Sequence, residues 1–102
     1  KLESTVSTRL TIAMLNKKGN ALLRAARLDE SLKAYLLAAG QARRGTAEWI
    51  IAGNGLSVVY LQAGNFFKAD SVVQEVFASY DADTKEDMVF ASVLNNYAAL
   101  KQ

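Results

Sequence analysis

Residues 49–80 constrain the fold of this chain most strongly, because they read as two amphipathic helices separated by a single break. The break is Ala63-Gly64-Asn65, and a glycine followed by an asparagine favours a turn. Apolar residues recur at helical spacing on both sides of it, and small residues occupy the positions where the two helices would touch. The stretch therefore predicts a hairpin of two α-helices.

A similar arrangement recurs upstream at residues 15–38 and begins again at Leu94. Gly19, Ser57 and Ala98 occupy equivalent small-residue positions, at intervals of 38 and 41 residues. Recurrence of one pattern along the chain distinguishes a helical repeat from a generic bundle. Because one hairpin cannot bury both of its faces, stacked hairpins must share a core. We therefore expect an all-α chain of five helices, and the alternative is an unrelated α-helical bundle.

Capping residues support these helix boundaries. Thr46 and Asn65 are expected to cap the third and fourth helices, since their side-chain oxygens can accept a free amide of the first turn. Asp83-Thr84-Lys85-Glu86 has the spacing of a capping box, which makes Asp83 the expected cap of the fifth helix.

Two glycines, Gly53 and Gly55, lie inside the third expected helix. A glycine inside a helix is less stable than an alanine by about 1 kcal/mol. Two of them indicate either that a neighbouring helix approaches the backbone closely or that this helix is locally weak.

The middle unit resembles a tetratricopeptide repeat (TPR). The residues that carry the resemblance, in family order, are Leu56-Ser57, Tyr60, Gly64-Asn65-Phe66, Ala69, Val73 and Val76. The upstream unit matches at Leu15, Gly19, Leu22, Leu28, Ser31, Tyr35 and Ala38. It departs from the family where Lys18 replaces an apolar residue and Ala26 replaces the turn glycine. In the middle unit, Gly53 stands where a large apolar residue is usual and Asp81 where a proline is usual.

The resemblance implies a right-handed superhelix of α-hairpins. Repeat 1 would cover about residues 5–44, repeat 2 about 46–80, and a capping or truncated repeat 3 about 84–102. A chain of this kind is expected to be a piece of a larger protein.

In this family the first helices of successive hairpins line a concave groove that binds protein segments. The resemblance puts these residues on the groove face: Ala13, Asn16, Lys17, Asn20, Leu23, Arg24, Ile51, Asn54, Gly55, Val58, Leu61, Gln62, Ser92, Asn95, Asn96, Ala99 and Gln102. Of these we nominate Asn16, Lys17, Asn20, Arg24, Asn54, Val58, Leu61, Asn95 and Asn96 as the peptide-binding site. A carboxamide can both donate to and accept from a peptide backbone. The resemblance therefore implies a scaffold or adaptor that binds a peptide segment or helix of another protein.

Charge is unevenly distributed along the chain. Residues 1–51 hold nine lysines and arginines against four acids, and residues 52–102 hold three against six, which gives +5 and −3. Lys17 and Arg24 would attract an acidic partner by long-range steering. The alternative to an adaptor is a structural or self-assembling repeat segment without its own ligand, which would associate through exposed terminal helices.

Composition argues against the other classes of function. The chain has no cysteine and no histidine, which excludes thiolate metal sites, imidazole bases and nucleophilic triads. We expect no enzymatic activity, cofactor or metal. A net charge of +2 is low for a nucleic-acid-binding domain, and no uncharged run approaches the roughly 18 residues of a membrane helix. The cytoplasm is the favoured compartment, although a mature exported chain would look the same.

Overall fold

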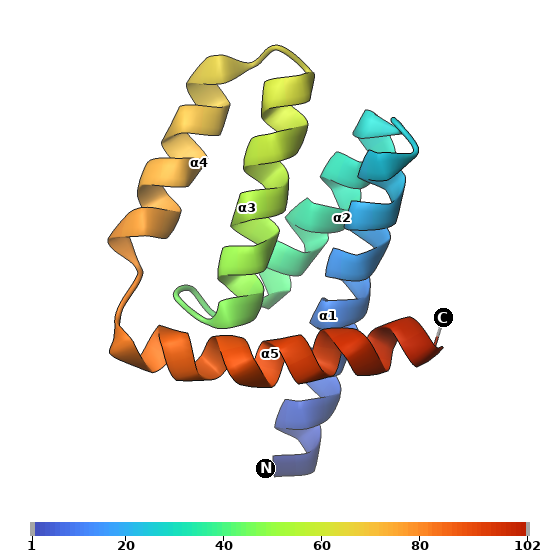
Figure 1. The fold of residues 1–102 in the computed structure, drawn as a ribbon, viewed down its shortest axis with the longest axis vertical. Helices are drawn as coiled ribbons and strands as arrows, with labels where there is room; N and C mark the ends of the chain where they lie inside the picture. Colours follow the sequence, from blue (N-terminus) through green and yellow to red (C-terminus); the bar gives the residue numbers. More distant parts are fainter. Residues whose placement is uncertain (1, 102) are drawn as a thin grey trace.

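The computed structural model describes residues 2–101, with the side chains of residues 5–81 and 84–100. This part of the chain forms five helices joined by short links, so the expectation of an all-α chain of five helices is confirmed (Figure 1). The helices are α1 (Leu2–Arg24), α2 (Leu28–Gln41), α3 (Ala47–Gln62), α4 (Phe66–Ala78) and α5 (Ala82–Lys101).

Helices adjacent in the chain pack side by side from α1 to α4, and α1 also packs against α3. Figure 1 shows α1 and α4 at opposite sides of the molecule, with α5 running below α2, α3 and α4 and crossing α1, whose N-terminal part extends beyond the crossing. Over the described residues, α5 packs against α1 and α3 and does not pack against α4. The first helix of a third stacked hairpin would pack beside α4, so α5 takes a different place from the one that a continuing stack requires.

The turns of the two hairpins share one hydrogen-bond scheme. In the first, the Arg27 amide donates to the Leu22 carbonyl at 2.9 Å, and in the second the Asn65 amide donates to the Tyr60 carbonyl at 2.8 Å. Both bonds link residues five apart, as in the Schellman ending of a helix. Corresponding residues lie 38 positions apart, the same interval that separates Gly19 from Ser57. The two hairpins therefore repeat one local structure.

Ala26 occupies the place in the first turn that Gly64 occupies in the second, and both have a left-handed backbone, with φ of 62° and 82°. A Cβ disfavours this conformation by about 1–2 kcal/mol, while glycine loses more chain entropy on folding. We expect Ala26→Gly to raise the free energy of unfolding by about 0.5 kcal/mol, and Gly64→Ala to lower it by about 1 kcal/mol. Urea denaturation measures both. A less stable Ala26→Gly chain would contradict the shared geometry.

The caps expected for α3 and α4 are confirmed. The Thr46 hydroxyl oxygen accepts the Trp49 amide at 3.4 Å, and the Asn65 side-chain oxygen accepts the Lys68 amide at 3.2 Å. Each bond satisfies an amide that the first helical turn leaves free.

The cap expected for α5 is wrong. The helix already begins at Ala82, and Asp81 supplies the cap by accepting the Thr84 amide at 2.9 Å. Residue 83 lies inside the first turn, and its side chain lies outside the described residues. A side chain can cap a helix only from the residue that precedes the helical backbone, which is why the acid two positions earlier takes the role.

The glycines of α1 and α3 are explained by close packing. The ring of Tyr35, from α2, lies between Gly19 of α1 and Gly55 of α3: a Cβ added at Gly19 would lie 2.9 Å from the ring, and one at Gly55 would overlap it. On the other side of α3, a Cβ at Gly53 would lie 2.5 Å from Val76 of α4. Each glycine of α3 therefore admits a side chain from a different neighbouring helix, and α3 is an unbroken helix.

Two apolar clusters hold the helices together. The larger one joins the first three helices and consists of Ile12, Tyr35, Ala38, Ala52, Leu56 and Val59. The smaller one fixes α5 to α1 and consists of Ala13, Leu94 and Ala98, with Val6, Leu10 and Met14 packed against it. Because α5 is held on α1, it closes one end of the space between α1 and α3.

Candidate functional site

The space between α1 and α3 contains a hollow of about 370 Å³, with α2 beneath it and α5 at one end. Its lining residues are Asn16, Lys17, Asn20, Leu23, Tyr35, Ile51, Asn54, Gly55, Val58 and Asn95. All of these except Tyr35 were expected on the groove face. Tyr35 was missed because it belongs to a second helix, which the resemblance puts behind the groove.

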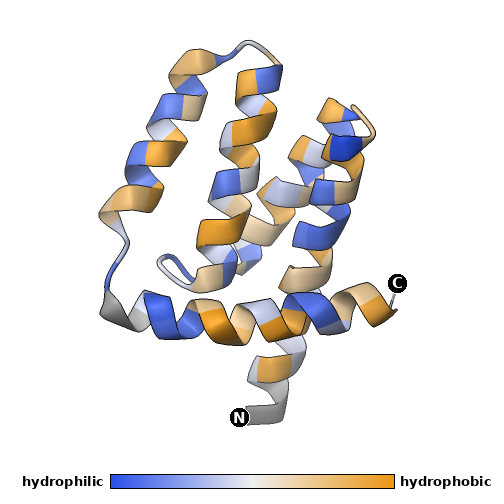
Figure 2. Ribbon diagram, viewed as in Figure 1, coloured by the Kyte–Doolittle hydropathy of each residue, from blue (hydrophilic) through white to orange (hydrophobic). Residues whose placement is uncertain are grey.

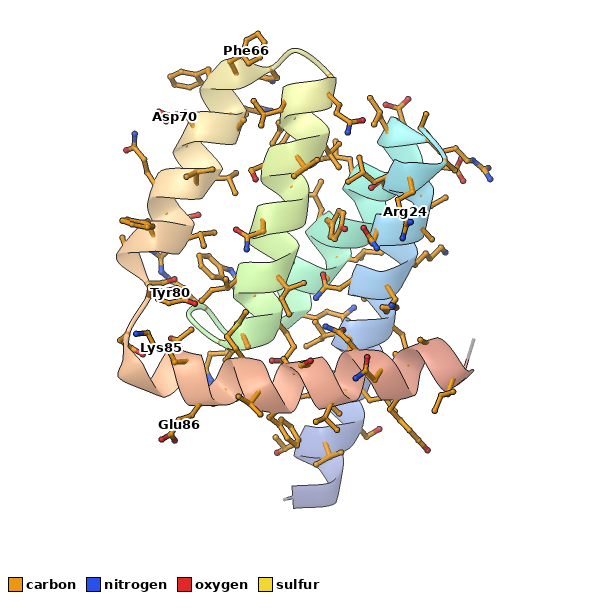
Figure 3. The ribbon with its side chains drawn as sticks, in the orientation of Figure 1. Arg24, Phe66, Asp70, Tyr80, Lys85 and Glu86 are labelled. Atoms are coloured by element: carbon orange, nitrogen blue, oxygen red, sulfur yellow. The ribbon has the colours of Figure 1, made fainter. Side chains whose placement is uncertain are left out.

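The hollow brings together six of the nine residues nominated as the binding site: Asn16, Lys17, Asn20, Asn54, Val58 and Asn95. Arg24 and Leu61 follow Asn20 and Val58 by about one helical turn and do not line the hollow. Figure 3 shows Arg24 near the upper end of α1, away from α5. Asn96 is exposed on α5 outside the hollow, although its neighbour Asn95 lines it.

Two residues that line this hollow carry a buried carbonyl oxygen without a hydrogen-bond partner, and these are the only such side-chain atoms among those described. One is Oδ1 of Asn16, a residue that is 3% exposed. The Asn16 amide nitrogen donates to the Glu48 carbonyl at 3.2 Å, which orients the carboxamide and leaves its oxygen free. The other is Oδ1 of Asn95, contributed by α5. An unsatisfied buried acceptor lowers stability by about 1–3 kcal/mol, so both oxygens favour a ligand that donates N–H or O–H groups.

The charge of the hollow comes from Lys17, the one lysine, arginine, aspartate or glutamate among its lining residues. Arg24 lies beyond it on α1. Burial raises the pKa of Tyr35 above its ordinary value of 10, so its phenol is neutral at physiological pH. The hollow therefore combines several amide groups, apolar contact from Val58 and Ile51, and a single cationic side chain.

A network of charged side chains lies towards the N-terminal end of α1. The guanidinium of Arg9 binds both carboxylate oxygens of Glu48 and lies 2.6 Å from the Asp87 carboxylate. The ring of Phe90 lies 4.6 Å from the same guanidinium. The hydrogen bonds that Arg9 donates to Glu48, and then the one that it donates to Asp87, raise the pKa of Arg9 although burial lowers it, so this group stays charged. The network joins α1, α3 and α5 through one side chain.

The network also helps to fix one side chain of the hollow, that of Asn16. Glu48 is 2% exposed, and its backbone carbonyl is the acceptor that holds Asn16. Sequence reasoning missed this network, because Arg9 lies 39 residues from Glu48 and 78 from Asp87 and no local pattern pairs them.

A larger hollow, of about 980 Å³, lies beside this network, between the N-terminal half of α1, the link from α2 to α3 and the first half of α5. Two of its polar side chains form hydrogen bonds across helices: Asp87 accepts the Ala47 amide at 3.0 Å, and the Thr84 hydroxyl donates to the Gly45 carbonyl at 3.2 Å. Because these bonds join the α2–α3 link and the start of α3 to α5, we assign this hollow a structural role. The smaller hollow, with its two unpartnered oxygens, is the better candidate binding site.

Among the described side chains, those of residues 5–81 and 84–100, no group of three acidic side chains is arranged to hold a metal ion. None of the helices within residues 2–101 has the length and apolar character needed to cross a bilayer. Comparison of the chain with protein-family models, curated proteins and solved structures found no match.

Proposed function

We propose that this protein is an adaptor that binds a peptide segment or helix of another protein in the hollow between α1 and α3. The observation that carries the proposal is that Asn16 and Asn95, two residues from different helices that line one hollow, each hold a buried side-chain oxygen without a hydrogen-bond partner. A peptide backbone supplies N–H donors at regular spacing and can satisfy such acceptors without regard to its side chains.

The remaining lining residues suit the same ligand. Asn20 and Asn54 are exposed carboxamides on α1 and α3, and each can pair with a peptide N–H and a carbonyl. Val58 and Ile51 offer apolar contact. Lys17 favours an acidic residue in the bound segment, by an attraction that salt weakens.

The repeated hairpins support the proposal independently. The two turns share their hydrogen bonds at an interval of 38 residues, which is longer than the interval of about 34 residues usual in the TPR family. The crossing helix α5 makes the site shorter than the open groove of a long array, because it closes the space at Asn95. We therefore propose a short bound segment, one that approaches from the end of α1 and α3 at which Arg24 and Leu61 lie.

Selection from a displayed library of random peptides on the purified chain tests this function. We expect recovered peptides to bind the native chain and to lose at least about tenfold in affinity against the Asn20→Ala, Asn54→Ala double variant, since each lost hydrogen bond contributes about 0.5–1.5 kcal/mol. Calorimetric titration measures both affinities. Because the two side chains are exposed, we expect the unfolding free energy to change by less than about 0.5 kcal/mol.

Asn96→Ala is the matched control, because it removes the same side chain from a position next to the hollow but outside it. Equal affinity for the native chain and the double variant would contradict binding in the hollow. If Asn96→Ala lowers the affinity as much as the double variant does, the peptide binds on the outer face of α5 instead.

A further inference from the structure

The two helices at the sides of the molecule each keep an open face. Among the described residues α4 packs against α3 alone, and α1 packs against α2, α3 and α5 on one part of its circumference. Figure 1 shows these two helices on opposite sides of the structure. The two faces are therefore available at the same time and point in different directions.

The open face of α4, defined here by Phe66, Asp70, Val73 and Phe77, is apolar with one central acid. Phe66, Val73 and Phe77 are 67%, 47% and 83% exposed, and their spacing of seven and four residues aligns them along the helix. Ala69 and Val76 are the buried residues of α4 and point in another direction, towards α3. Figure 3 shows Asp70 at the outer edge of α4, and Figure 2 shows hydrophobic residues recurring along this helix.

The open face of α1 is a shallow hollow of about 710 Å³. Its lining residues are Thr11, Met14, Leu15, Lys18, Ala21, Leu22, Ala25 and Arg27. Lys18 lies at its centre, with Leu15 and Leu22 one turn away on either side. It shares no residue with the candidate binding site.

The two faces complement each other in charge and in shape. The α4 face projects phenylalanines around an acid, whereas the α1 face is hollowed and apolar around a lysine. No ion pair of the described residues includes Lys18 or Asp70, although the Asp70 carboxylate accepts a hydrogen bond from the exposed Gln74 side chain at 2.9 Å. The halves of the chain that carry the two faces have net charges of +5 and −3, so two copies attract each other when the α4 side of one meets the α1 side of the next.

We infer that the chain self-associates head to tail: the α4 face of one copy packs into the α1 hollow of the next, with Asp70 beside Lys18. Such a contact joins two different faces, so it leaves one free face at each end, and because the two faces lie on opposite sides of the molecule it adds further copies in an open chain. It also leaves the hollow between α1 and α3 open in every copy. Because one helix on one helix is a small interface, the association is weak and dependent on concentration.

Sedimentation velocity on the full chain, from about 10 µM to about 1 mM, tests the inference at low salt. We expect the mean mass of the native chain to rise to about twice the monomer mass or more at the highest concentration. Asp70→Lys and Lys18→Asp should each keep the chain monomeric, because each puts like charges at the contact. An equimolar mixture of the two variants should associate again, since the swapped face of each fits the swapped face of the other.

Lys33→Asp, an equal charge change on an exposed part of α2, should leave the association unchanged. Circular dichroism verifies that every variant is folded. A native chain that stays monomeric throughout would overturn the inference, as would association that persists in both single variants. Loss of association in Val93→Asp, at an exposed position on α5, would instead identify the apolar side of that helix as the interface.

Discussion

Replacing Tyr35 with alanine is expected to lower the free energy of unfolding by about 4 kcal/mol, the range found when a buried aromatic side chain is truncated. Tyr35 is 4% exposed, and its ring lies between Gly19 and Gly55 on two different helices. Neither glycine has a side chain that could move into the cavity, so little of the loss is recovered. Since domains of this size are stable by about 5–15 kcal/mol, the change removes a large part of the total.

Urea denaturation followed by circular dichroism measures the effect. Tyr80→Ala is the control, because Tyr80 is 46% exposed, and we expect a loss of less than about 1 kcal/mol there. If the two substitutions lowered the free energy of unfolding by similar amounts, Tyr35 would not fill the space between α1 and α3.

The same ring makes stability depend on pH above the ordinary tyrosine range. Burial raises the pKa of Tyr35 in the folded chain above 10, so the protonated phenol favours folding. Its contribution is complete below the unfolded pKa of 10 and is lost as the pH rises through the higher folded value. Tyr35→Phe keeps the ring and removes the titrating group, so this part of the alkaline loss should be absent from that variant.

The second large effect is expected at Arg9. Arg9→Ala should lower the free energy of unfolding by about 3 kcal/mol or more, because it leaves the 2% exposed Glu48 carboxylate without its cation. It also removes the ion pair to Asp87, which connects α5 to the rest of the domain. We expect the loss to appear as faster hydrogen exchange in α5 together with a lower denaturation midpoint.

Arg27→Ala is the matched control, since Arg27 forms an exposed ion pair with Glu30 at 2.6 Å. Surface pairs of this kind contribute little, and we expect a change within about 0.5 kcal/mol. Arg9→Met combined with Glu48→Gln should be more stable than Arg9→Met alone, because the second substitution removes the uncompensated buried charge. If the effects of Arg9→Met and Glu48→Gln on the free energy of unfolding simply added, Glu48 would not depend on Arg9 for compensation of its charge.

The residues expected on the groove face show which parts of the candidate site the sequence could predict. Asn20 and Asn54 lie on the expected faces of their helices because the 3.6-residue period relates each of them to its neighbours on the same helix. The exposed place of Asn96, by contrast, follows from the direction in which α5 crosses α1. That direction depends on Leu94 and Ala98 packing against Ala13, at the far end of the chain.

The sequence by itself determined the helices, two of their caps and the hairpin turn at Gly64, and its resemblance to a repeat family indicated nine of the ten residues that line the hollow between α1 and α3. These features depend on interactions between residues a few positions apart, which periodicity and turn chemistry record. Only the tertiary structure decided the crossing of α5, the network of Arg9, Glu48 and Asp87, and the place of Tyr35 between two glycines. Each of these joins residues from different helices, and their energies depend on the packing of the whole chain rather than on any local pattern.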